Sequence, residues 1–143
     1  MATVVGKTLW SGSDEEFFEL VTKVVFTTGF SRSVVEKRWE AFRGAFQGFR
    51  IEDVAAFDEV TVEKMLERDS GIIRNVRKVR ATIANARTCL ELRSAYGTLQ
   101  LFCESLAVLG EHAACITLRK AFSLVGESAA KALWVHLVQE ENR

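Results

Sequence analysis

The sequence contains no proline, whereas average usage near 5% would give about seven prolines in a chain of 143 residues. Because proline interrupts helices, its absence lets one helix follow another without obligatory breaks. No apolar run approaches the roughly 18 uncharged residues of a membrane span, which excludes an integral membrane protein. The three cysteines form no Cys-x-x-Cys pair, so we expect no disulfide framework and a reduced, cytoplasmic setting.

The chain also lacks an excess of either charge. Its 19 basic residues balance 19 acidic ones, which argues against a general coat for nucleic acids but does not exclude a local basic site. Residues 1–7 lack the charged start and long apolar stretch of a signal peptide. With 48% hydrophobic residues, the chain is predicted to fold as one domain over residues 1–143.

Helical spacing is the dominant pattern from residue 13 onward. Ser13 and Glu16 have the form of a capping box, and Ser33 and Glu36 repeat it, so each pair predicts the start of a helix. Gly29 lies between these two helices and can end the first with a positive φ angle. The second predicted helix carries the apolar residues Val35, Trp39, Phe42 and Phe46.

The longest predicted helix begins near Asn75, a favourable N-cap residue, and ends before Gly97. Its predicted inner face consists of Val76, Val79, Ile83, Ala86 and Leu90. The other helices are predicted over residues 51–57, 61–68, 98–109 and 111–122 and after Gly126. No alternating strand pattern competes, so the predicted fold is all-α, a compact bundle of about seven or eight helices.

The neutral total hides a separation of charge along the chain. Residues 52–69 have a net charge of −5, whereas residues 74–87 have a net charge of +5. Arg74, Arg77 and Lys78 lie at the N-terminal end of the longest helix, where cations are disfavoured unless an anion such as a phosphate docks there. The alternative is a solvated basic face that pairs with the acidic segment.

Residues 70–75 read Ser-Gly-Ile-Ile-Arg-Asn and lie between two predicted helices. Gly71 permits a tight turn, while Ile72 and Ile73 can insert into the core and leave the amides of the turn facing outward. These features predict a helix–hairpin–helix near residues 61–90. Such a motif holds a DNA backbone by main-chain N–H groups, irrespective of base sequence.

This hairpin resembles that of the DNA-3-methyladenine glycosylase I family. The resemblance rests on residues 67–75, Lys78, Ala81, Ile83, Asn85, Ala86 and Arg87, and it extends to residues 18–20, 29–31 and 43–46 upstream and to Leu118 and residues 120–126 downstream. It implies a base-excision repair enzyme that flips a damaged base out of double-stranded DNA and cleaves the N-glycosidic bond with water. No cofactor and no membrane partner are implied.

Several positions depart from the pattern of that family. Val24 occupies the position of its pocket glutamate, and Arg32 replaces the tryptophan of its Gly-Leu-Ser-Trp turn. Arg77 replaces a typical hairpin glycine. The family's zinc-binding cysteines and histidines have no counterparts, and His112 and His136 share no ligand spacing, so we expect no metal site.

The resemblance implies phosphate docking at Gly71, Ile73 and Arg74, with Lys78 beside them. Arg77 can add a direct phosphate contact in place of the close backbone approach that a glycine allows.

The resemblance does not assign the residues that would recognise the damaged base. Phe26, Phe30 and Trp10 are candidates for a base pocket, each with a place in the core as the alternative. Glu19 is either a pocket carboxylate or a solvent-facing helix residue. Lys23 is a candidate Schiff-base nucleophile, with an ordinary surface lysine as the alternative.

The catalytic residues thus stay unassigned, and two classes of function are open. The first is a DNA glycosylase that excises an alkylated base. The alternative is a catalytically inactive DNA-binding relative, or a helical interaction module whose hairpin is vestigial.

Overall fold

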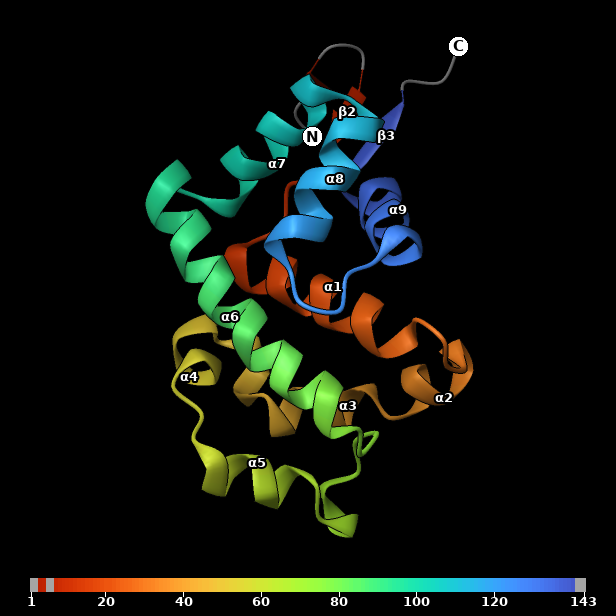
Figure 1. The fold of residues 1–143 in the computed structure, drawn as a ribbon, viewed down its shortest axis with the longest axis vertical. Helices are drawn as coiled ribbons and strands as arrows, with labels where there is room; N and C mark the ends of the chain where they lie inside the picture. The colour runs from red at the N-terminus through yellow and green to blue at the C-terminus, as the bar shows by residue number, and fades with distance from the viewer. Residues whose placement is uncertain (1–2, 5–6, 141–143) are drawn as a thin grey trace.

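The computed structural model describes residues 3–4 and 7–140, with side chains from Trp10 to Val138. Nine α-helices lie within this part of the chain, so the predicted all-α class is confirmed (Figure 1). They are α1 (Asp14–Thr27), α2 (Arg32–Lys37), α3 (Trp39–Ala45), α4 (Ile51–Ala55), α5 (Glu59–Met65), α6 (Val76–Tyr96), α7 (Leu99–Leu109), α8 (Glu111–Ala121) and α9 (Glu127–Leu137). Two 3₁₀ turns, η1 (Gln47–Phe49) and η2 (Arg68–Ser70), precede α4 and α6.

Helix α1 crosses the middle of the molecule (Figure 1). Helices α7, α8 and α9 lie on one side of it, and α2 to α5 lie on the other (Figure 1). The long helix α6 packs against α1, α4, α5 and α7 and therefore joins the two sides.

The predicted second helix is wrong in two respects. Its N-cap is Ser31, whose hydroxyl accepts from the Val34 amide, and not Ser33. It also divides at Arg38 into α2 and α3, because the helical hydrogen-bonding pattern is interrupted there. This division explains why the structure has one helix more than the sequence pattern predicts.

The predicted bounds of α6 are confirmed. Asn75 caps it, its side chain accepting from the Lys78 amide, and Gly97 ends it. The assignment of Val76 to the inner face is wrong, because this side chain is 41% exposed on the first turn of α6.

A small antiparallel sheet, which the sequence pattern does not predict, joins the two ends of the described chain. Strand β2 (Lys7–Leu9) pairs with both β1 (Thr3–Val4) and β3 (Val138–Glu140). The register places Leu9 opposite Val138. Strands of two or three residues are too short to show an alternating pattern.

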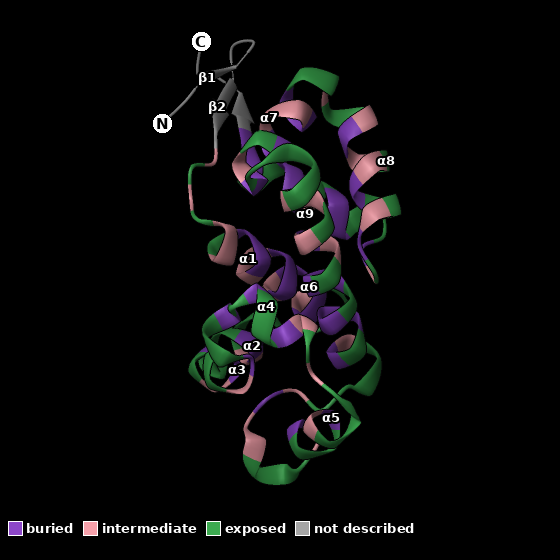
Figure 2. Cartoon of the chain, turned by 90° about the vertical axis from the view of Figure 1, so that its left-hand side faces the viewer, coloured by how far each residue is buried: buried purple, intermediate pink, exposed green. Residues whose placement is uncertain are grey.

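The core centres on α1 (Figure 2). Its buried apolar residues are Phe17, Phe18, Val21, Val24, Val25 and Phe26. An aromatic layer packs beneath it, where the ring of Trp39 stacks on Phe42 at 4.9 Å and on Phe49 at 5.5 Å. Cys89 and Cys103 are free thiols within the same core, and burial raises the pKa of Cys103 to about 12.

A buried amide fastens the α8–α9 loop to α6. The Asn85 side chain accepts from the Ser123 amide at 2.7 Å and donates to the Ser123 carbonyl at 3.2 Å. Asn85 is 1% exposed, so both bonds are shielded from water on the α6 side.

Replacing Asn85 with alanine removes both bonds and should lower the free energy of unfolding by about 1–3 kcal/mol. Urea denaturation measures the change. The control is Gln100→Ala on α7, where we expect a change within about 0.5 kcal/mol. Equal effects of the two substitutions would contradict the anchoring role of Asn85.

Candidate nucleic-acid interface and pocket

The α5–α6 turn, residues 70–75, begins at the last residue of η2 and leads into the long helix α6. Gly71 has φ +82°, and the ideal Cβ of any other residue there would lie 2.9 Å from the Cβ of Ala41. The Gly71 carbonyl accepts from the Arg38 guanidinium at 3.2 Å. Ile72 is buried, as predicted, so the turn is attached to the body of the protein from both of its sides.

The turn carries backbone donors without protein acceptors. Within the described chain, the amides of Gly71, Ile73 and Arg74 donate to no protein acceptor. The side chains of Arg74 and Arg77 are exposed and form no ion pair with any described residue. Amides and guanidinium groups are therefore available together at the start of α6.

Lys78 is held inward instead. Its ammonium donates to the carbonyls of Phe26 and Thr28, both at 3.1 Å, at the C-terminal end of α1. It also lies 5.9 Å from the ring centroids of Phe26 and Phe30. Partial burial lowers the pKa of Lys78. Lys78 thus connects the turn to α1, and its contact with a phosphate stays a prediction.

Farther along α6, the basic residues pair with the acidic segment. Arg80 forms an ion pair with Glu59 and lowers the pKa of that carboxyl group, and Arg93 has the same effect on Glu52. Arg87 donates from Nε to the Ala55 carbonyl at 3.1 Å. The alternative of a paired basic face is therefore correct for this part of α6, whereas Arg74 and Arg77 remain unpaired among the described residues.

A pocket of about 120 Å³ opens between α1, α2 and α9. Its lining residues are Leu20, Lys23, Val24, Thr27, Arg32, Glu36, Ala132 and His136. A neighbouring hollow of about 240 Å³ shares Leu20, Lys23 and His136 and adds Trp10, Glu16 and Glu19. Val24 and Arg32, two of the positions at which the resemblance implies a departure from the family pattern, both line the pocket.

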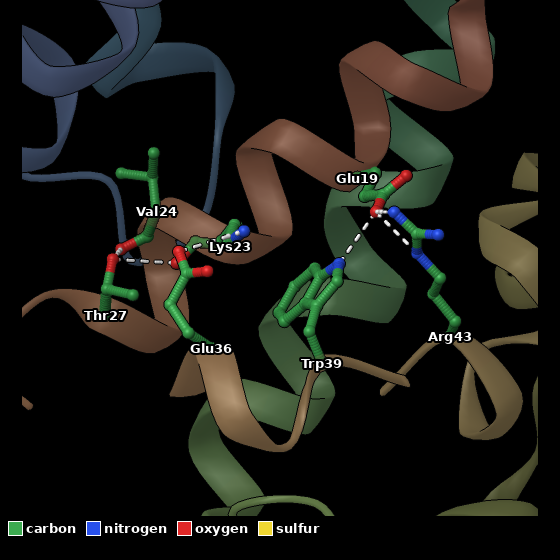
Figure 3. A network of polar contacts seen from close by, with 7 residues as sticks. All are labelled: Glu19, Lys23, Val24, Thr27, Glu36, Trp39 and Arg43. Carbon is green, nitrogen blue, oxygen red and sulfur yellow. Dashed lines mark hydrogen bonds and ion pairs between the residues drawn. The ribbon is translucent and has the colours of Figure 1, made fainter. Parts of the chain in front are cut away.

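Figure 3 shows the polar network beside this pocket. The Lys23 ammonium lies 3.1 Å from Glu36 Oε1 and 5.1 Å from the centroid of the Trp39 ring. On the other side of that ring, the Trp39 indole donates to Glu19 Oε2 at 2.7 Å, and Arg43 donates to the same oxygen at 3.0 Å. The indole thus separates two ion pairs.

The three aromatic residues predicted for a base pocket lie in different places. Trp10 lines the larger hollow. Phe26 is fully buried and packs against Phe42, with ring centroids 4.7 Å apart. Phe30 is 47% exposed on the α1–α2 turn and lines neither the pocket nor the hollow. Phe26 and Phe30 both lie 5.9 Å from the Lys78 ammonium, but the three aromatic residues do not line one common pocket.

The sequence pattern does not predict the contacts that Glu36 and Trp39 make at the site. Glu36 fitted a capping box with Ser33, and Trp39 fitted an apolar helix face. The cap at Ser31 takes Glu36 out of the predicted capping box. Trp39 keeps its predicted place in the core, with 6% exposure, and its indole also donates to Glu19. Among the described residues, no three histidine, cysteine or acidic side chains gather as a metal site, and no helix is long and apolar enough to cross a membrane.

Comparison with known protein families matches residues 7–133 to the family described as methyladenine glycosylase. The matched residues include the whole α5–α6 turn and the α1 and α2 walls of the pocket. The chain belongs to the methyladenine glycosylase family. The resemblance noted in the hairpin sequence is therefore confirmed.

The similarity extends to individual members of this family. DNA-3-methyladenine glycosylase 1 of Escherichia coli (strain K12) is 36% identical over 78 residues, which are 54% of this chain and 41% of that protein. A crystal structure of 3-methyladenine DNA glycosylase I superposes with a TM-score of 0.77 at 24% identity, covering 88% of this chain and 79% of the other. The structure of 3-methyladenine DNA glycosylase I from Staphylococcus aureus superposes with a TM-score of 0.75 at 19% identity. This match covers 88% of this chain and 78% of the other.

Gly71→Ala should destabilise the protein by about 1–3 kcal/mol through its left-handed backbone alone, and by more through the contact with Ala41. Gly29→Ala is the matched control, because Gly29 also has a positive φ but an added Cβ there meets nothing within 4 Å. Urea denaturation of both variants measures the difference. A loss at Gly71 no larger than that at Gly29 would contradict the close approach of the turn to α3.

Proposed function

We propose that this protein binds duplex DNA through the α5–α6 turn and hydrolyses the N-glycosidic bond of an alkylated base placed in the 120 Å³ pocket between α1, α2 and α9. The observation that carries the proposal is the family match over residues 7–133, which includes both the turn and most of the pocket wall. In this proposal the turn acts as a helix–hairpin–helix, and Gly71, Ile73 and Arg74 are its phosphate contacts.

The donors at the start of α6 support DNA binding. Amides at the N-terminal end of a helix attract phosphates, and the exposed guanidinium groups of Arg74 and Arg77 strengthen that attraction. Phe30 lies next to Lys78 and exposes its ring at the same end of the molecule. An exposed aromatic ring beside a phosphate site can stack on a DNA base.

Cleavage of the N-glycosidic bond of an alkylated purine needs only modest catalysis. An alkylated purine nucleotide is already cationic, so its base is a good leaving group once it has been flipped out of the duplex. What the pocket must add is stabilisation of the positive charge that develops on the sugar, and a group that takes a proton from water.

A second candidate function is DNA binding without hydrolysis. Two residues favour it, since Val24 and Arg32 line the pocket at the positions where the family pattern has a glutamate and a tryptophan. Base release separates the two candidates. A protein with no affinity for DNA even at low salt would instead be a helical interaction module.

Replacing both Arg74 and Arg77 with alanine should weaken binding to a short DNA duplex and reduce its dependence on salt. Each lost phosphate contact lowers the log–log slope by about 0.9, so the expected reduction is about 1.8. Fluorescence anisotropy over a salt series measures it. The control is the double variant Arg119→Ala/Lys120→Ala, which also removes two positive charges but at the C-terminal end of α8, outside the turn. Equal slopes for the two double variants would refute docking at the turn.

Single-turnover incubation with methylated duplex DNA should release methylated purines faster than the protein-free control, because the flipped base leaves as a neutral molecule. Chromatography of the released bases measures the rate. Release of no base from alkylated or deaminated DNA, combined with salt-sensitive binding, would replace the first candidate with the second.

A further inference from the structure

This inference rests on the proposed hydrolytic function. We propose that Glu36 on α2 supplies the carboxylate that accepts the proton of the attacking water. Among the described residues that line the 120 Å³ pocket, Glu36 is the sole carboxylate, and it faces Val24 and Lys23 on α1 (Figure 3).

Glu19 is the other acidic side chain in the network, and its contacts make it a structural group. The oxygen Oε2 of Glu19 accepts from the Trp39 indole and from Arg43 Nε, and Arg43 Nη2 lies 2.9 Å from it. Glu19 lines the neighbouring hollow instead of the pocket. These contacts hold the Glu19 carboxylate between Trp39 and Arg43, outside the pocket that Glu36 lines.

Glu36 is held in place but keeps one oxygen available. Oε1 lies 3.1 Å from the Lys23 ammonium, which itself rests against the Trp39 ring. Within the described chain, Oε2 of Glu36 has neither a hydrogen bond nor an ion pair. The side chain is 53% exposed, so water can reach it. One oxygen thus fixes the orientation while the other can accept a proton.

The step balances without any further reactant. The C1′–N bond of the cationic nucleotide breaks, and its electron pair leaves with the base, which becomes neutral. Positive charge passes to the sugar, where the Glu36 carboxylate stabilises it as in glycoside hydrolysis. A water oxygen then bonds to C1′ and gives its proton to Glu36, which releases it to solvent.

The test compares single-turnover base release by the wild-type protein and by Glu36→Gln. Loss of a general base lowers a rate by about 10²–10⁴-fold, and we expect that loss with unchanged affinity for DNA. The matched control is Glu40→Gln on α3, an exposed acidic residue outside the pocket, whose rate should equal the wild-type rate. A rate for Glu36→Gln close to that of Glu40→Gln would overturn the proposal.

Chemical rescue separates a catalytic role from a structural one. Glu36→Ala leaves space in the pocket, so added formate should restore part of the rate of this variant and leave the wild-type rate unchanged. An inactive Glu36→Ala that formate does not restore would overturn the assignment of Glu36 while the wild-type activity upholds the proposed function. An inactive wild-type protein would instead refute the hydrolytic function, and the assignment with it.

Discussion

Burial of the apolar face of α1 is the constraint on which the rest of the structure depends. The rings of Phe17, Phe18 and Phe26 point into the core, and α2, α4, α6, α7 and α9 all pack around this one helix. Because that face is buried, the opposite face of α1 lies toward α2, and Lys23 on this face lines the pocket. Removal of large apolar side chains from water stabilises by roughly 1.5–3 kcal/mol each, more than any surface ion pair in the molecule can supply.

The end of α1 also connects the two parts of the candidate site. Helix C-terminal carbonyls carry partial negative charge, and Lys78 satisfies two groups there, those of Phe26 and Thr28. The same lysine belongs to the first turn of α6, directly after the α5–α6 turn. The Lys78 ammonium therefore links the proposed phosphate site to the helix that lines the pocket. Arg38, which donates to the Gly71 carbonyl, braces the turn from the α2–α3 side.

The pocket brings charged side chains of both signs together. Val24 contributes no polar group, but the adjacent Lys23 and the facing Glu36 bring one charge of each sign to the same space. Trp39 keeps this pair apart from the Glu19–Arg43 pair by standing between them (Figure 3). With Arg32 also in its lining, the pocket offers hydrogen-bond donors as well as the Glu36 carboxylate as an acceptor.

Local sequence signals predicted much of this fold and part of the site. The caps at Ser13 and Asn75 and the stop at Gly97 follow from contacts within a few residues, so the sequence alone determined where α1 and α6 begin and α6 ends. It also determined the buried Ile72 and the exposed Arg74 of the turn. Only the tertiary structure decided that Arg80 is paired while Arg74 is not, that Lys78 turns inward, and that Glu36 enters the pocket. Those outcomes depend on partners brought together from distant parts of the chain, and residue spacing within one helix carries no information about such partners.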